Sequence, residues 1–199
     1  MIEVRGQKGP ILAAGLLLCA MVAPGVARAE KRSMDVRQSV VKVYAYKSGL
    51  FSVFAHNHEI IAPITQGAVE ESGNPSVKLV VEAAKMQVLD PKVSDKDRAE
   101  IQKTMLGSEV LDTARYPEIR FESTGVEKNG DARWSVRGNL VLHGRTRPVV
   151  AEVAEENGRY RGSAMLKQTD FGIKPVRIAG GTVSVKDSVK IEFEIVLTE

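Results

Sequence analysis

Two histidines placed two residues apart carry the clearest chemical signal in this chain. Side chains at positions i and i+2 of a strand point to the same face, so the imidazoles of His56 and His58 would converge. A converging pair supplies half of a zinc or copper site, and a third ligand would have to come from Glu59 or His143. The alternative is a polar rim of His56, His58 and His143 that hydrogen-bonds to backbone groups or to a ligand head group. A pair alone is a weak metal signal, which favours the rim.

Motifs for covalent or phosphoryl chemistry are absent from the sequence. It contains no Gly-x-Ser-x-Gly elbow, no phosphate loop and no His-Glu-x-x-His pair. The fragment Asp170-Phe171-Gly172 also occurs in protein kinases, but here the glycine-rich loop, the strand lysine and the catalytic loop of those enzymes are missing. Adjacent carboxylates such as Glu155-Glu156 fall on charged turns. We therefore expect a protein that is not an enzyme and that carries no cofactor.

The N-terminus, residues 1–29, has the features of a signal peptide. Arg5 and Lys8 precede a mostly apolar stretch at 11–22, and Ala27-Arg28-Ala29 places small residues at the positions that a signal peptidase reads. About twelve apolar residues are too few to span a bilayer core of roughly 30 Å as a helix. We expect cleavage after Ala29 and a periplasmic or secreted mature protein.

Composition constrains the remaining chain, residues 30–199, which we expect to form one domain. Cys19 is the only cysteine, and it lies in the expected leader behind Leu18 and not behind a small residue, so we expect neither lipidation nor a disulfide. The leader carries three basic residues and one acidic residue, so its removal lowers the formal net charge from +3 to +1. This balance gives no support for nucleic-acid binding.

Alternating residues between 120 and 153 predict three antiparallel strands joined by two tight turns. The first turn is expected at 128–131, because Asn129-Gly130 accepts the positive φ of a two-residue hairpin. The second is expected at 143–146, where Gly144 supplies the positive φ. One apolar face is then formed by Trp134, Val136, Leu140, Leu142, Val149, Ala151 and Val153.

The other segments predict more short strands and one helical interruption. Ser94 is expected to cap a helix over 95–106 that stops at Gly107. The whole pattern is typical of an antiparallel barrel or sandwich. Further strands are expected at 36–46, 50–54, 60–70 with a bend or edge at Pro63, 77–83, 160–167 after a turn at 156–159, 182–185, and 188–198 after a turn at 186–188, the last with Val189, Ile191, Phe193, Ile195 and Leu197 inward.

The central strands also resemble a known family. The run ARYPEIRFES followed by VRGNLVLHGRTRPVV resembles the YceI-like family of secreted bacterial polyisoprenoid-binding proteins, and the resemblance extends from about Ser39 to Leu197. It implies an antiparallel lipocalin-like β-barrel of about eight strands with a helical insertion near residues 94–114. It also implies a long isoprenoid ligand, such as a polyprenyl phosphate or a quinone tail. The segment YKSGLFSVFAHNHEI departs from the family pattern and could line one mouth of the barrel.

An alternating barrel of this size holds either packed side chains or one small ligand. If the interior is open, the protein is expected to sequester or carry the lipid. A basic group could make peripheral membrane contact, or it could simply form a solvated strand face. The group consists of Arg145, Arg147, Arg159 and Arg161. The alternatives are a metal-binding protein that uses His56 and His58, or a packed structural or stress-response barrel without ligand. The wall candidates for ligand binding are Phe51, Val81, Phe121, Trp134, Leu140, Phe193 and Ile195.

Overall fold

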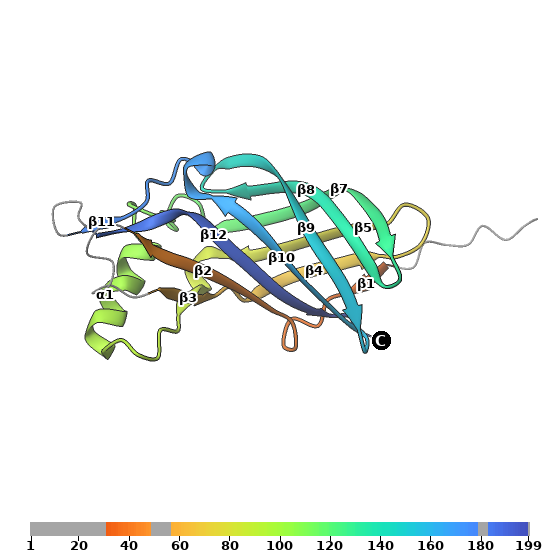
Figure 1. Cartoon of the computed structure of the whole chain (residues 1–199), viewed down its shortest axis with the longest axis horizontal. Helices are drawn as coiled ribbons and strands as arrows, with labels where there is room; N and C mark the ends of the chain where they lie inside the picture. The colour runs from red at the N-terminus through yellow and green to blue at the C-terminus, as the bar shows by residue number, and fades with distance from the viewer. Residues whose placement is uncertain (1–30, 49–56, 179–182, 199) are drawn as a thin grey trace, which may run out of the picture.

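A single antiparallel sheet curls into a barrel, with one helix at an end (Figure 1). The computed structural model describes residues 31–48, 57–178 and 183–198, and twelve strands of that part belong to the sheet. The strands are β1 (Lys31–Ser33), β2 (Val40–Ser48), β3 (His58–Ile61), β4 (Ile64–Glu70), β5 (Ser76–Glu82), β6 (Gln87–Val88), β7 (Glu118–Gly130), β8 (Arg133–Leu142), β9 (Arg145–Glu156), β10 (Arg159–Lys167), β11 (Arg177–Ile178) and β12 (Val183–Val196).

The barrel closes through a bent strand. β3 pairs with β2 and β4 pairs with β5, while only Ala62-Pro63 separates β3 from β4. Counting β3 and β4 as one bent strand, a ring of eight runs β2, β3–β4, β5, β7, β8, β9, β10 and β12, back to β2. This confirms the expected barrel of about eight strands. The bend at Pro63 is confirmed, but the alternative of an open edge is wrong, because β4 pairs with both β1 and β5.

Two of the expected tight turns are confirmed. His143 and Gly144 have φ values of 50° and 70° between β8 and β9, and Asn157 and Gly158 have 54° and 75° between β9 and β10. Positive φ at both central residues is the conformation that matches the twist of flanking strands. The apolar face predicted for β8 and β9 is confirmed too, since all seven of its side chains face the barrel interior.

The turn predicted at 128–131 is wrong by two residues. β7 continues to Gly130, and the two-residue turn is Asp131-Ala132. A turn at Asn129-Gly130 would pair Gly125 with Trp134 and direct Val126 outward. The observed register instead pairs Val126 with Val136, both of which face the interior, and takes up the difference as a bulge near Asn129.

The C-terminal strand is longer than predicted. No turn interrupts residues 186–188: β12 runs from Val183 to Val196, with an irregular register between Val185 and Val189. Both halves of β12 pair with β2, so a bulge replaces the expected turn. The first strand begins later than predicted, because residues 36–38 form a turn before β2. The strand expected at 50–54 lies outside the described residues.

Helix α1 (Asp95–Leu106) is the predicted insertion and covers one end of the barrel (Figure 1). Ser94 caps it by accepting a hydrogen bond from the Asp97 N–H at 3.2 Å. Gln102 fixes it to β6: its Oε1 accepts from the Val88 N–H at 2.7 Å, and its Nε2 donates to the Met86 carbonyl at 2.8 Å. We call this the α1 end, and the opposite end, where β1 pairs with β4, the β1 end.

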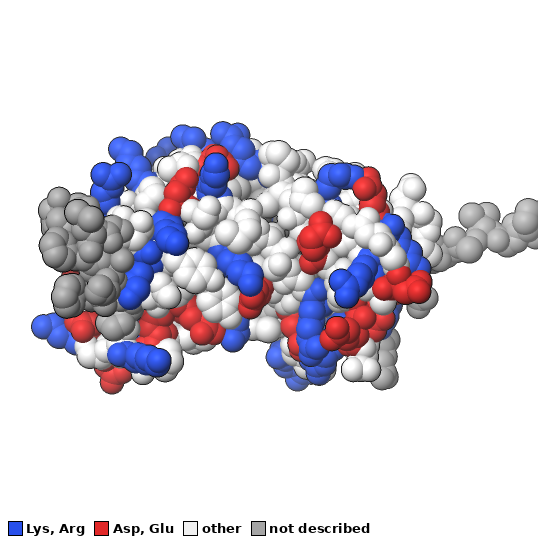
Figure 2. All heavy atoms as spheres, in the orientation of Figure 1, with Lys and Arg blue, Asp and Glu red and all other residues white. Residues whose placement is uncertain are grey.

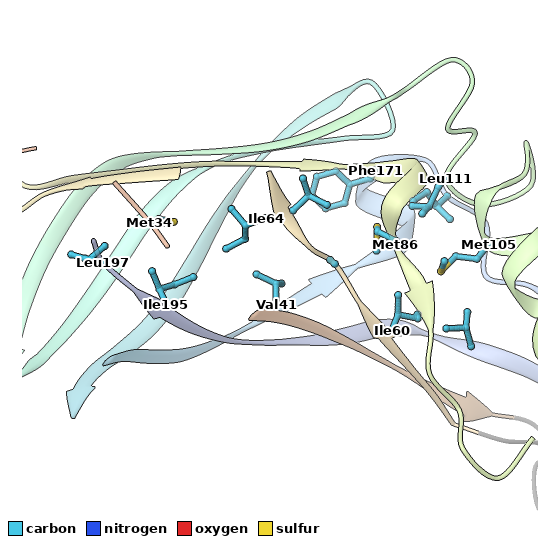
Figure 3. Packing of buried hydrophobic residues seen from close by; sticks show 14 residues of the cluster. Met34, Val41, Ile60, Ile64, Met86, Met105, Leu111, Phe171, Ile195 and Leu197 are labelled. Atoms are coloured by element: carbon cyan, nitrogen blue, oxygen red, sulfur yellow. The ribbon is translucent and has the colours of Figure 1, made fainter. Parts of the chain in front are cut away.

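Buried apolar side chains are spread along the inside of the barrel from one end to the other (Figure 3). Met34 and Leu197 lie at the β1 end, while Met86, Met105 and Phe171 lie toward the α1 end. Between them, inward-facing side chains are only partly buried, which indicates that they border open space. These include Val43, Leu79, Ile119, Leu140, Ile191 and Phe193. No helix among the described residues has the length and apolarity needed to cross a membrane.

Candidate functional site: an apolar tunnel with two polar ends

The barrel encloses a cavity of about 710 Å³ with a mostly apolar wall. This volume falls within the range of roughly 300–1,000 Å³ that small-molecule sites occupy. The wall includes Met105 and Leu111 at the α1 end and Met34 and Trp134 at the β1 end, so the cavity runs along the barrel. The interior of the barrel is therefore open, which is the condition on which the lipid-binding prediction rests.

The cavity is long and narrow. Inward-facing residues of β12 border it from Val183 to Ile195. At about 3.3 Å per residue this is roughly 40 Å of strand, and a barrel tilt of about 40° leaves roughly 30 Å along the axis. Such a tunnel suits an extended chain better than a compact ring system.

Two glycines on the wall leave room for phenyl rings. A Cβ on Gly162 would lie 2.4 Å from Cζ of Phe193, and a Cβ on Gly138 would lie 2.4 Å from Cζ of Phe121. Both rings therefore lie against bare backbone on the neighbouring strand. A side chain at either glycine would push its ring toward the tunnel axis, so the glycines help to keep the tunnel open.

Six of the seven predicted wall residues border the tunnel, and the seventh, Phe51, lies outside the described residues. That they contact a ligand stays a prediction. The six are Val81, Phe121, Trp134, Leu140, Phe193 and Ile195.

The α1 end of the tunnel carries an imidazole held by a buried carboxylate. His58 borders the tunnel, and its Nδ1 lies 2.6 Å from Oδ2 of Asp90. The side chain of Asp90 is only 2% exposed, and its Oδ1 accepts from the Glu59 N–H at 2.8 Å. Both carboxylate oxygens are therefore occupied, and the ring of His58 is fixed in place.

The other two histidines of the predicted rim differ from His58. His56 lies outside the described residues. His143 is not among the described residues that border the tunnel: its Nδ1 lies 3.2 Å from the Phe171 carbonyl, and its ring centroid lies 4.6 Å from that of Tyr116. Within the described part of the chain, no three His, Cys, Asp or Glu side chains are grouped as a metal site would require.

The β1 end of the tunnel is polar as well, but its groups bind one another. The Tyr160 hydroxyl donates to Glu71, which pairs with Arg32 at 3.3 Å, and Arg32 Nε donates to the Thr198 carbonyl at 3.2 Å. Burial, and then the hydrogen bond to Glu71, raises the pKa of Tyr160 to about 12. The ring centroids of Tyr160 and Trp134 lie 5.9 Å apart, and both residues border the tunnel at this end.

Two of the four arginines on β9 and β10 pair with carboxylates. Arg161 Nε lies 2.7 Å from Glu194, Arg159 pairs with the same carboxylate, and Arg161 also contacts Glu156 at 3.1 Å. Arg147 Nε donates to the Asp170 carbonyl at 3.0 Å. Basic and acidic side chains are interspersed over the face of the molecule in Figure 2. A solvated strand face is therefore favoured over a phosphate site.

Sequence reasoning missed Asp90 and the contact between Tyr160 and Glu71. Asp90 is 32 positions away from His58 and precedes Pro91, so it resembles an ordinary turn residue. Tyr160 and Glu71 are 89 positions apart. Only the pairing of β3 with β6, and closure of the barrel, bring these partners together.

Comparison with known proteins gives one family. A family model described as the YceI-like domain matches residues 33–197. A UPF0312 protein of Pseudomonas savastanoi pv. phaseolicola is 39% identical over 88 residues, 39% of this chain and 46% of that protein. A UPF0312 protein of Azotobacter vinelandii is 38% identical over 104 residues, 47% of this chain and 54% of that protein. The matched region thus spans about half the length of these curated relatives.

Two solved structures share the fold. The crystal structure of Burkholderia cenocepacia BcnA has a TM-score of 0.60 at 17% identity and covers 83% of this chain and 99% of its own. A polyisoprenoid binding domain from Saccharophagus degradans, implicated in plant cell wall breakdown, has a TM-score of 0.55 at 14% identity and covers 82% of this chain and 95% of its own. At these identities the likeness concerns the fold alone.

Proposed function

The chain belongs to the YceI-like domain family, and from that premise we propose that it is an exported protein that sequesters or carries an isoprenoid-like lipid in its barrel. The observation that carries the proposal is the tunnel of about 710 Å³, whose apolar wall runs from the α1 end to the β1 end. The protein binds its ligand without covalent chemistry.

The tunnel offers enough apolar contact for useful affinity. Each buried methylene contributes about 0.8 kcal/mol, so a few isoprene units exceed the roughly 8 kcal/mol of a micromolar complex. The excess offsets the cost of ordering the chain. Because the tunnel is long and narrow, a long hydrocarbon chain with methyl branches suits it. The S. degradans polyisoprenoid binding domain, which has the same fold, supports this ligand class. A polyprenyl phosphate and a quinone with an isoprenoid tail are the candidates.

Export completes the proposal. Residues 1–29 act as a signal peptide, and the mature protein begins one residue before β1 (Lys31–Ser33). In the periplasm or outside the cell, the barrel takes its lipid from a membrane by transient peripheral contact and shields the tail from water.

Native mass spectrometry of protein purified from its own host tests the proposal. A bound mass that matches an isoprenoid lipid is expected, and protein stripped of lipid should take up a polyprenol, a polyprenyl phosphate or a prenylated quinone. A barrel that is empty as isolated and takes up none of the three would reject the lipid-binding function.

A further inference from the structure

His58 is a polar member of the tunnel wall with one ring nitrogen still available. It lies two residues before Ile60 on β3, and both side chains border the tunnel. Asp90 holds Nδ1 at 2.6 Å. Among the described residues Nε2 has no hydrogen-bond partner, and no buried side-chain nitrogen or oxygen of that part is left unpaired, so Nε2 borders open space.

The contact with Asp90 sets what Nε2 can do. When Asp90 is ionised it only accepts hydrogen bonds, and Nδ1–H of His58 then donates to its Oδ2. In a neutral imidazole, Nε2 then accepts from a hydroxyl; in an imidazolium, it donates to a carbonyl. The buried carboxylate thus presents a fixed hydrogen-bonding group to a ligand oxygen.

At the opposite end, the described polar groups beside Trp134 are already paired with one another. The Tyr160 hydroxyl donates to Glu71, and Glu71 in turn pairs with Arg32, which also donates to the Thr198 carbonyl. A ligand head group at the β1 end would have to break these contacts. A head group at His58 gains a hydrogen bond without breaking one, so the α1 end is favoured.

Charges near the α1 end select against a phosphate. Asp97 and Glu100 of α1 also border the tunnel, as does Lys47 at the end of β2. Among the described side chains that border the tunnel at this end, two are acidic and one is basic, and Asp90 lies beside His58. A phosphate would meet repulsion from them, whereas a carbonyl or hydroxyl would not.

We infer that His58, positioned by Asp90, binds the uncharged oxygen head group of the lipid, a carbonyl or a hydroxyl, and that the tail runs toward Trp134. The inference rests on the proposed lipid-binding function and adds the orientation of the ligand and the chemistry of its head. His58 contacts the ligand, and Asp90 is a positioning residue.

The test compares ligands that share a tail and differ in the head. Dissociation constants are measured for squalene, which has no head, for a polyprenol, for a prenylated quinone and for a polyprenyl phosphate. The double variant His58→Leu/Asp90→Asn removes the imidazole, while the new amide oxygen still accepts from the Glu59 N–H. The matched control is His143→Asn, which removes an imidazole that is not among the residues bordering the tunnel.

The double variant should bind the polyprenol, the quinone or both on the order of tenfold more weakly and squalene unchanged, as loss of one ligand hydrogen bond predicts. His143→Asn should leave all four constants unchanged. Unchanged squalene binding also shows that the double variant has a formed tunnel.

Three results would overturn the inference while lipid binding stands. In the first, the double variant binds the polyprenol and the quinone as tightly as the wild type does. In the second, its affinity for squalene falls as much as its affinity for the polyprenol and the quinone. In the third, the wild type binds the polyprenyl phosphate more tightly than the polyprenol. If the wild-type protein binds none of the four, the proposed function itself fails and the inference with it.

Discussion

The phenyl ring of Phe193 lies against Gly162, its direct partner on the neighbouring strand. A Cβ on Gly162 would approach Cζ of Phe193 and the Glu152 carbonyl oxygen to 2.4 Å each. The ring can lie flat on the sheet only because this position has no side chain. Phe121 and Gly138 repeat the arrangement between β7 and β8. The pairing of an aromatic with a glycine lets large apolar side chains line the tunnel without closing it.

Gly162→Ala is expected to destabilise the protein by about 1–3 kcal/mol, because the new methyl group collides with backbone as well as with Phe193. The matched control is Gly125→Ala on β7, where no atom lies within 4 Å of the added Cβ. That change should be neutral or slightly stabilising, since alanine loses less entropy on folding than glycine. Urea unfolding of the two variants measures the difference, and equal free energies of unfolding would contradict the packing argument.

Gln102→Ala is expected to loosen α1 from the barrel. It leaves the Val88 N–H and the Met86 carbonyl without their partners on the helix, at a cost of about 1–2 kcal/mol. Hydrogen exchange should accelerate in α1 and β6 and stay unchanged in β8 and β9. Lys103→Ala, at the exposed neighbouring position, is the control. Uniform acceleration throughout the barrel would mean that Gln102 supports the whole fold.

The sequence predicted the strands and the faces of the sheet well, because alternation of apolar and polar residues decides both. Val189, Ile191, Phe193 and Ile195 all face the interior as predicted. The position of the turn in the β7–β8 hairpin could not be predicted locally. Asn129-Gly130 is the better turn sequence, yet burial of Val126 opposite Val136 determines the register.

The sequence alone could not predict that the barrel is open or that His58 contacts Asp90. A filled and a hollow barrel share the same alternation, and the close contact of Gly138 with Phe121 and of Gly162 with Phe193 becomes visible only in the structure. Asp90 meets His58 through pairing of β6 with β3, a contact that the local sequence does not predict. His143 has the same residue type but binds the Phe171 carbonyl.

The pH dependence of stability should report on Tyr160. Its pKa is about 12 in the folded protein against 10.0 for the free side chain, so below pH 10 it is protonated in both states. Between pH 10 and 12 the unfolded chain loses this proton while the folded chain keeps it. The free energy of unfolding should therefore fall with rising pH over this window and level off above it.

The comparison with Tyr160→Phe isolates this effect from the other groups that titrate in the same range. The variant should lose less stability than the wild type between pH 10 and 12, as measured by denaturant unfolding. Parallel pH profiles for the two proteins would show that the hydroxyl of Tyr160 is not protected by burial and Glu71 in solution.

Adjacent positions on β10 separate the inside of the barrel from the outside. Ala164 borders the tunnel opposite Ile191, whereas the side chain of Met165 is 59% exposed. Ala164→Phe should fill the lumen and reduce lipid uptake on the order of tenfold or more without destabilising the protein, because the ring enters open space. Met165→Phe should leave uptake unchanged. Equal uptake by both variants would place the lipid outside the tunnel.

Trp134 should report ligand entry, because it is the only tryptophan and it borders the tunnel next to Tyr160. A tail that replaces water beside the indole should shift its emission to shorter wavelength, and a tail brominated at its tip should quench it. The Ala164→Phe variant keeps Trp134 as its only tryptophan, so its emission should not respond.

If head groups bind at His58, a short-tailed quinone should bind without reaching the indole, and quenching should appear only as the tail lengthens. Quenching by the short-tailed compound as strong as by the long one would place the head near Trp134 and reverse the orientation.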